Sequence, residues 1–324
     1  MRRLAALALA TVPLLLASGG CSAGRAPTPE RTPAAVPGAV RPGPGATATP
    51  TPDAPAGRTA PRDPYDVGVR TLRMNRDGDR PLVVTVWFPA TGGGDAVAKG
   101  RFPVVVFSHG LGGTPTDYRT LLTRWAAAGF VVAAPAYPHT SRGAADFQVL
   151  DVINQPADAS YVLTRVLALD GAAGDPLRGH LDAARVGAAG HSAGGITTLG
   201  MFTLGRDARL DAGIVLAGSA LGVAGSYQGS AAPLLFVHGK RDEVVSYESG
   251  KAAYDTVPWP KAMVTLPDAG HLIGLRGADD PEFRVVADAT TEFLRWGLYG
   301  DPAAKRRLPA AARAGGVATL ANRL

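Results

Sequence analysis

The stretch "RVGAAGHSAGGITTLG", residues 185–200, decides the fold. Its first part is an apolar run typical of a buried strand, and its last part has small and apolar residues suited to a buried helix. Ser192 stands between them, in Gly190-His191-Ser192-Ala193-Gly194. The chain has 41 glycines, so the glycine pattern gains meaning only from these flanks. A strand, a Gly-x-Ser-x-Gly turn and a helix in this order predict a nucleophile elbow, which exposes a serine hydroxyl on a turn too sharp for side chains.

Strand patterns alternate with helix patterns on both sides of this stretch. Residues 66–74 and 81–90 alternate apolar and polar side chains around "RDGD", which predicts a β-hairpin. Further strands are expected at residues 102–110, 130–137, 185–192, 212–218, 233–239 and 261–267, and helices at 115–129, 156–171, 194–204, 246–257 and 282–297. This alternation predicts the α/β class, with a mainly parallel sheet covered by helices on both faces.

A serine hydroxyl is a weak nucleophile, so Ser192 requires a base that a third group orients. Behind a nucleophile elbow, the acid and then the histidine follow the serine in the chain. Two histidines follow Ser192, namely His238 and His271. His271 lies in "LPDAGHLIG", residues 266–274, beyond the last expected parallel strand, where a loop could carry it over the sheet. His238 lies at the end of a strand and is expected to be structural, so we predict His271 as the base.

The acid must follow a neighbouring strand. "LLFVHGKRDEVVS", residues 234–246, offers Asp242, with Glu243 as the alternative beside it. Asp242 is favoured because backbone N–H groups of a turn can hold a short carboxylate. Asp211 precedes its strand and therefore belongs to the opposite edge of the sheet. Asp268 is three residues from His271 and is expected to cap that loop.

An oxyanion hole needs two backbone N–H donors, one from the residue after the nucleophile and one from an earlier loop. These are predicted to be Ala193 and Leu111, the latter within "SHGLGG", residues 108–113. His109 precedes the nucleophile in the chain and is expected to brace this loop. His, Cys, Asp and Glu form no cluster with the spacing of metal ligands, so no metal and no cofactor are expected.

Three segments together resemble the α/β-hydrolase superfamily: "GVRTLRMNRDGDRPLVVTVWFPA" (68–90), "FPVVVFSHGLGGTPTDYRTLLTRWAAAGFVVAAPAYP" (102–138) and "GHSAGG" (190–195). The resemblance covers residues 66–298. It is strongest to the bacterial branch of the platelet-activating factor acetylhydrolases and to chlorophyllase-like esterases, with cutinase-like polyester hydrolases nearby. It implies the α/β-hydrolase fold and assigns Ser192, His271, Leu111 and Ala193 the roles given above.

One departure from the animal acetylhydrolases concerns the acid. They place it after the strand that follows the nucleophile helix, where this chain has "LAGSALG", residues 216–222, without a carboxylate. The resemblance to cutinase-like members therefore implies Asp242. The polyester hydrolases also carry an aromatic residue in this loop, which the chain lacks.

The resemblance implies a serine esterase that forms an acyl-enzyme on Ser192. About a dozen residues separate Ser219 from Ala232, too few for a helical lid, so we expect an open site suited to short or exposed acyl groups. The expected partner is a small-molecule or lipid ester, and the expected state is a monomer. An acyltransferase, a lipase or cutinase-like polyester hydrolase, a peptidase and a binding module that kept only the fold are the alternatives.

The N-terminal region predicts export. In residues 1–21, Arg2 and Arg3 precede an apolar run, Leu4 to Leu16, which is too short for a membrane span and typical of a signal peptide. Cys21, the only cysteine, resembles the lipidated cysteine of a bacterial lipobox, although Ser18 replaces the usual aliphatic residue. We expect a membrane-anchored lipoprotein, with an ordinary cleavage site and a secreted protein as the alternative.

Composition divides the rest of the chain. Residues 22–62 are rich in Pro, Ala and Thr and are expected to form an extended linker. The net charge of +6 comes from residues 1–62 and from 301–324, a basic tail that is expected to be helical or frayed. The catalytic domain, 63–300, has 21 basic and 24 acidic residues, which argues against a nucleic-acid partner. Contact with a membrane is expected only through the N-terminal anchor.

Overall fold

The computed structural model describes residues 59–221, 226–275 and 277–324. All elements named below lie in one unit, Pro52–Leu324. The expected signal peptide, the lipidation of Cys21 and most of the linker lie outside the described residues. None of the described helices is long and apolar enough to cross a membrane.

The strands are β1 (Asp66–Arg76), β2 (Arg80–Thr91), β3 (Ala96–Val97), β4 (Phe102–Ser108), β5 (Val131–Ala136), β6 (Leu181–His191), β7 (Leu210–Leu216), β8 (Leu234–Gly239), β9 (Lys261–Leu266) and β10 (Thr319–Arg323). The α-helices are α1 (Arg119–Ala127), α2 (Gln155–Leu167), α3 (Ala193–Phe202), α4 (Tyr247–Thr256), α5 (Pro281–Tyr299) and α6 (Pro302–Ala311). Short 3-10 helices are η1 (Gly92–Gly94), η2 (Pro115–Tyr118), η3 (Val149–Ile153), η4 (Ala168–Gly171) and η5 (Ala314–Gly316).

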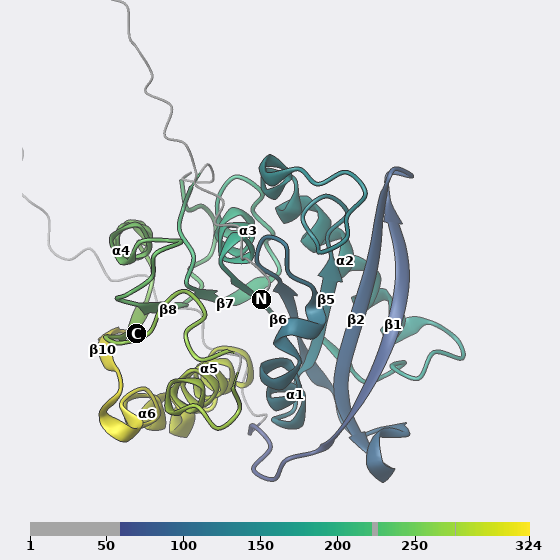
Figure 1. The fold of residues 1–324 in the computed structure, drawn as a ribbon. Coiled ribbons are helices and arrows are strands. Elements are labelled where there is room, and N and C mark those ends of the chain that lie inside the picture. The colour runs from purple at the N-terminus through teal and green to yellow at the C-terminus, as the bar shows by residue number, and fades with distance from the viewer. Residues whose placement is uncertain (1–58, 222–225, 276) are drawn as a thin grey trace, which may run out of the picture. The chain divides into compact units, whose positions relative to one another are not determined.

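One sheet joins these strands in the order β1-β2-β5-β4-β6-β7-β8-β9-β10, with β3 paired to β2 (Figure 1). The six central strands, β5, β4, β6, β7, β8 and β9 in sheet order, run parallel to one another. The strands β1, β2, β3 and β10 pair antiparallel with their neighbours. The predicted hairpin is β1–β2, and Asp77 and Gly78 at its turn have φ values of 56° and 90°. The mainly parallel sheet and the hairpin are thus confirmed.

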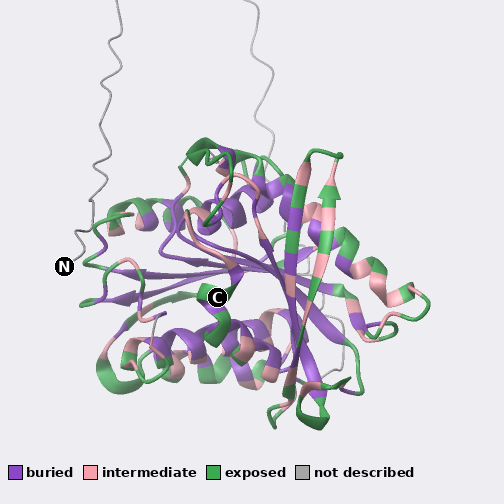
Figure 2. Cartoon of the chain, turned by 45° about the vertical axis from the view of Figure 1, so that its right-hand side comes forward, coloured by how far each residue is buried: buried purple, intermediate pink, exposed green. Residues whose placement is uncertain are grey.

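Helices cover both faces of the sheet, as predicted. The helices α1, α5 and α6 contribute to one apolar cluster and α2, α3 and α4 to the other (Figure 1). In β4, Val105 and Phe107 face the first cluster while Val104 and Val106 face the second. Because both faces of β4 are buried, its sequence is a continuous apolar run instead of an alternating one. Figure 2 shows the central strands buried and the outer hairpin strand partly exposed.

The boundary drawn at residue 300 from charge composition differs from the structure. Residues 302–311 form α6, whose Leu308 is buried in the same cluster as α1 and α5. The chain then returns to the sheet as β10, which pairs antiparallel with β9 from Thr319 opposite Thr265 to Arg323 opposite Lys261. The side chains of β10 are mostly exposed, so the strand has no apolar alternation by which it could be predicted. It covers the backbone groups that β9 would otherwise present at a sheet edge.

Candidate active site

Ser192 lies on a strained turn between β6 and α3. Its φ of 56° and ψ of −120° place it outside the regions that non-glycine residues prefer. The chain passes so close to itself here that a Cβ on Gly190 would lie 2.1 Å from the Gly194 carbonyl oxygen, and a Cβ on Gly194 would lie 2.0 Å from that of Ser108. The two glycines of the motif are therefore required by backbone packing. The Ser192 N–H donates to the Leu216 carbonyl of β7 at 2.8 Å, which ties the turn to the sheet.

His271 connects Ser192 to Asp242. Its Nε2 lies 2.8 Å from the Ser192 Oγ, and its Nδ1 lies 2.8 Å from Asp242 Oδ2. A carboxylate oxygen only accepts, so Nδ1 carries the proton and Nε2 is free to accept one from the serine hydroxyl. The His271 side chain is 16% exposed, so the line of groups ends at the protein surface where a substrate can enter.

Asp242 is buried and accepts on both oxygens. Its Oδ1 accepts the N–H groups of Val244 at 2.9 Å and Val245 at 2.8 Å, and its Oδ2 lies 3.2 Å from His238 Nε2 as well as close to His271. Burial alone would raise the pKa of Asp242, but the hydrogen bonds from His238, His271 and the two backbone groups together hold this pKa well below its usual range. The carboxylate therefore stays charged and keeps His271 in the tautomer that can act as a base.

The other acids considered from the sequence lie elsewhere. Glu243 is exposed. Asp211 accepts the N–H of Val186, near the opposite edge of the sheet. Asp268 is an exposed partner of Arg241.

One of the two expected oxyanion donors directly follows Ser192, and the other follows Gly110, which packs close to Ser192. Ala193 is the first residue of α3, where N–H groups have no partner within the helix. Next to Leu111, the Gly110 carbonyl accepts from His109 Nδ1 at 2.8 Å and from the Gly113 N–H at 2.9 Å. A trans peptide directs the N–H opposite to its carbonyl, so these bonds fix the direction of the Leu111 N–H. Within the described residues, neither the Leu111 nor the Ala193 N–H has a hydrogen-bond partner.

His109 holds this loop to the next strand, as expected. Its Nε2 accepts the N–H of Tyr137 at 3.2 Å, just beyond β5, while its Nδ1 donates to Gly110. Burial lowers the pKa of His109 to about 4. The ring is therefore neutral near pH 7 and acts as a donor and an acceptor at the same time.

The strand order and the turn around Ser192 can now be compared with known families. The family model described as platelet-activating factor acetylhydrolase, isoform II, matches residues 74–165. This family consists of serine esterases of the α/β-hydrolase type. The chain has the α/β-hydrolase fold. The match supports a hydrolase that acts on esters, and it includes residues 108–113 but ends before Ser192. A comparison with curated proteins finds no match.

The candidate active site of the chain opens into a pocket of about 270 Å³. Leu111, Leu272 and Leu275 form its apolar wall. Arg142 and Asp117 form a polar part of its rim and make an ion pair, with 2.8 Å between Arg142 Nη2 and Asp117 Oδ2. Between β5 and α2, the described chain contains only the five-residue η3 as helical structure. Among the described residues, no group of three or more His, Cys, Asp and Glu could hold a metal ion.

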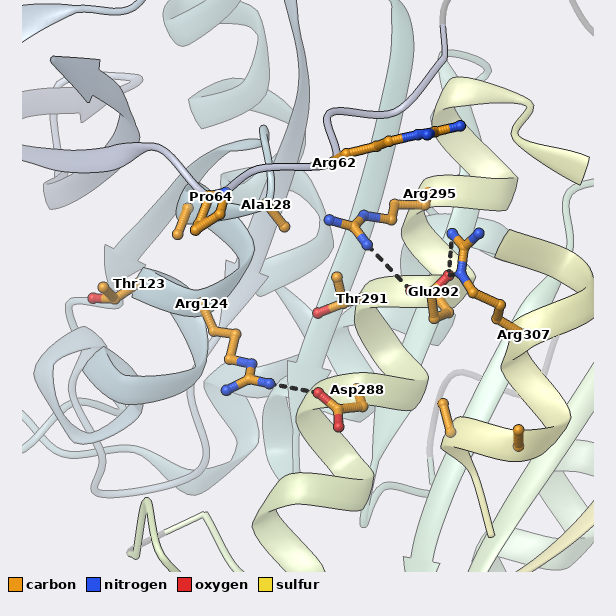
Figure 3. A pocket seen from close by; sticks show the side chains of 13 residues that line it. Arg62, Pro64, Thr123, Arg124, Ala128, Asp288, Thr291, Glu292, Arg295 and Arg307 are labelled. Carbon is orange, nitrogen blue, oxygen red and sulfur yellow. Dashed lines mark hydrogen bonds and ion pairs between the residues drawn. The ribbon is translucent and has the colours of Figure 1, made fainter. Parts of the chain in front are cut away.

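A larger hollow of about 660 Å³ lies between α1, α5, α6 and residues 62–64 of the chain. Apart from Arg62, its charged side chains pair with one another: Arg124 with Asp288, and Arg295 and Arg307 with Glu292 (Figure 3). None of the residues lining it is a Ser, Cys or His that could serve as a nucleophile or base. The smaller pocket at Ser192 is therefore the candidate site.

Two residues near Ser192 were given no role by the sequence analysis. His191 occupies the variable position directly before the serine in the motif, and Tyr118 ends η2 on the far side of the oxyanion loop. Both are buried, and they touch each other. The place of His191 inside the serine motif could have indicated a role for it. The sequence contains no pattern that indicates a role for Tyr118.

Proposed function

We propose that the chain is an exported serine hydrolase that cleaves carboxylic esters through an acyl-enzyme on Ser192. The observation that carries this proposal is the unbroken line from Ser192 Oγ to His271 Nε2 and from His271 Nδ1 to Asp242, with 2.8 Å at each step. These distances lie within the range for proton transfer between a nucleophile and its base. The unpartnered N–H groups of Leu111 and Ala193 supply the electrostatic stabilisation that such a reaction also needs.

In the proposed mechanism, Ser192 Oγ attacks the ester carbonyl carbon while His271 Nε2 accepts the hydroxyl proton. The carbonyl oxygen becomes an oxyanion and accepts hydrogen bonds from the Leu111 and Ala193 N–H groups. The intermediate collapses as His271 gives the proton to the leaving alkoxide, which leaves as an alcohol and yields the acyl-enzyme. Water then attacks the acyl carbon, His271 takes its proton, and the acid leaves as Ser192 regains a hydrogen.

The proposed substrates are esters with short or exposed acyl groups, either small molecules or lipids. Support comes from the modest volume of the pocket and from its apolar wall of Leu111, Leu272 and Leu275. The steps above use only protein groups and water. We propose that the enzyme acts as a monomer, because every group in the mechanism comes from one chain.

The experiment is the hydrolysis of p-nitrophenyl esters of increasing acyl length by the wild type and by Ser192→Ala. We expect the wild type to hydrolyse the acetate with a rapid initial release of p-nitrophenolate, and Ser192→Ala to lose activity by at least about 10³-fold. Labelling by an alkyl phosphonate, followed by mass spectrometry, should modify Ser192 alone. Activity that survives Ser192→Ala would show that another group performs the reaction.

A lipase or cutinase-like hydrolase with the same triad is the second candidate, and one observation favours it. Large apolar side chains are exposed on loops that follow the parallel strands, at the edge of the sheet where Ser192 lies. These are Leu111, Phe147, Val149, Leu150, Ile153, Leu221, Val244 and Leu272. The same ester series decides between the two: a kcat/KM that keeps rising beyond eight acyl carbons, or that increases on emulsified ester, favours the lipase. An acyltransferase would show ester formation when a primary alcohol is added.

Export and lipidation rest on the sequence of residues 1–21. We propose that Cys21 is the acylated first residue of the mature protein, with secretion after an ordinary cleavage as the alternative. Mass spectrometry of the mature N-terminus from the native host tests this directly. An unacylated protein in the medium would refute the anchor and leave the enzymatic proposal untouched.

A further inference from the structure

His191 and Tyr118 join the two loops on which the proposed chemistry depends. Tyr118 Oη accepts the Gly110 N–H of the oxyanion loop at 2.9 Å and lies 2.9 Å from His191 Nδ1. His191 Nε2 lies 2.9 Å from the backbone carbonyl oxygen of His271. Three consecutive hydrogen bonds therefore connect the oxyanion loop to the loop that carries His271.

The direction of each bond in this chain is determined. The His271 carbonyl can only accept, so His191 Nε2 must carry a hydrogen. In the neutral ring Nδ1 then carries no hydrogen and accepts from the Tyr118 hydroxyl, while the Tyr118 oxygen accepts from the Gly110 N–H. This requires a neutral imidazole, and burial lowers the pKa of His191 to about 4, which keeps the ring neutral near pH 7. The chain of donors and acceptors has no alternative arrangement near neutral pH.

The packing leaves little freedom in this region. Tyr118 and His191 are 7% and 3% exposed. The rings of His191 and His271 lie in contact, with centroids 4.9 Å apart. A Cβ on Gly110 would lie 3.1 Å from the Ser192 Cβ, 3.1 Å from the Tyr118 hydroxyl and 3.2 Å from His191 Nδ1. Gly110 therefore lies close to all three side chains, and a larger residue at this position would contact each of them.

We infer that Tyr118 and His191 are positioning residues that hold the oxyanion loop and the His271 loop in register around Ser192, and that they act on turnover instead of on ester binding. This inference rests on the proposed function, since it assigns the two residues to the same site. His191 is the only hydrogen-bond partner of the His271 carbonyl in the described chain. Shifts of about 1 Å in such a site can cost on the order of 100-fold in rate.

Two substitutions of His191 separate its two bonds. The amide of Gln reaches the position of Nε2, so His191→Gln can still donate to the His271 carbonyl. The amide of Asn reaches only the position of Nδ1, so His191→Asn keeps a contact to Tyr118 and loses the one to His271. We expect His191→Asn to lower kcat by about 10- to 100-fold with KM changed less than about twofold, and His191→Gln to recover most of that loss.

Tyr118→Phe removes the hydroxyl at the centre of the chain and is expected to lower kcat to a similar extent. The double variant with His191→Asn should be no slower than the slower single variant, because both break one unit. Tyr299→Phe is the matched control: it also removes a buried hydroxyl, which donates to the Gly129 carbonyl at 2.5 Å, but on α5, away from the pocket. It should lower Tm and leave kcat unchanged.

Equal kcat values for His191→Gln and His191→Asn, or a wild-type kcat for Tyr118→Phe with a lowered Tm, would overturn the inference and leave only a structural role. If a His191 variant does not fold, the comparison of Tyr118→Phe with Tyr299→Phe decides alone. Ser192→Ala in the same assay separates this inference from the proposed function. If Ser192→Ala loses activity and the positioning variants keep full activity, the positioning role of Tyr118 and His191 is rejected alone. Activity in Ser192→Ala instead rejects the proposed function.

Discussion

Asp242→Asn tests the proposed mechanism at the point where the structure leaves least room for compensation. Each carboxylate oxygen accepts two donors, the Val244 and Val245 N–H groups on Oδ1 and the two imidazoles on Oδ2. An Asn side chain has one acceptor oxygen and one NH₂ group. In either orientation its NH₂ group therefore faces two N–H donors.

The backbone N–H groups cannot change, whereas His271 can exchange its tautomer. We therefore expect the Asn oxygen to stay with Val244 and Val245 and its NH₂ group to face His271. His271 would then accept at Nδ1 and carry its proton at Nε2, where it can no longer take the Ser192 proton. The expected loss in kcat is about 10³- to 10⁴-fold, or about 4 to 5.5 kcal/mol in the activation free energy.

The assay is the steady-state hydrolysis of p-nitrophenyl acetate at pH 7.5, with thermal unfolding measured on the same samples. Glu243→Gln is the matched control, because it removes a carboxylate from the neighbouring, exposed side chain. We expect this control to stay within about twofold of the wild type. A kcat for Asp242→Asn within tenfold of the wild type, in a folded protein, would refute the reasoning, and a loss confined to Glu243→Gln would move the acid to that residue.

Three further predictions concern the support of the site. Gly190→Ala should destabilise the fold by more than about 4 kcal/mol, since its Cβ would meet the Gly194 carbonyl at 2.1 Å, whereas Gly171→Ala, with open space around it, should be close to neutral in urea unfolding. The pKa of His109, lowered to about 4, means that the folded protein binds fewer protons than the unfolded chain from about pH 4 to 6.5. The free energy of unfolding should therefore fall as the pH decreases through this window, and His109→Gln should flatten part of the decline. Truncation after Ala312 removes β10, which should lower Tm and promote concentration-dependent aggregation, visible by light scattering.

The sequence was sufficient to predict the central strands and the turn at Ser192, because these features are encoded locally. The apolar run of β4 follows from burial on both faces, and the glycines around Ser192 follow from a turn that admits no Cβ. Chain order and strand ends also sufficed to select His271 and Asp242, which the structure brings together. Their catalytic roles stay predictions until the variants are measured.

The remaining features depend on contacts between distant segments, which leave no periodic pattern. β10 is held by backbone pairing to β9, and its exposed side chains carry no apolar signal. Tyr118 and His191 are 73 positions apart and meet only after η2 packs beside the end of β6. His238 was expected to be structural from its place in a strand, yet its Nε2 also lies 3.2 Å from the carboxylate that orients His271.

The predicted acid follows β8, whereas the end of β7 is closely packed against α3. There, a Cβ on Gly218 would lie 2.9 Å from the Cα of Gly195, in the first turn of α3, and a Cβ on Gly195 would lie 2.9 Å from the Cα of Gly218. This close approach lets α3 begin directly behind Ser192, and it leaves no space for a side chain at position 218. The His271 loop follows β9 and Ser192 follows β6, so β8 lies between them in the sheet, and Asp242, which follows β8, contacts His271.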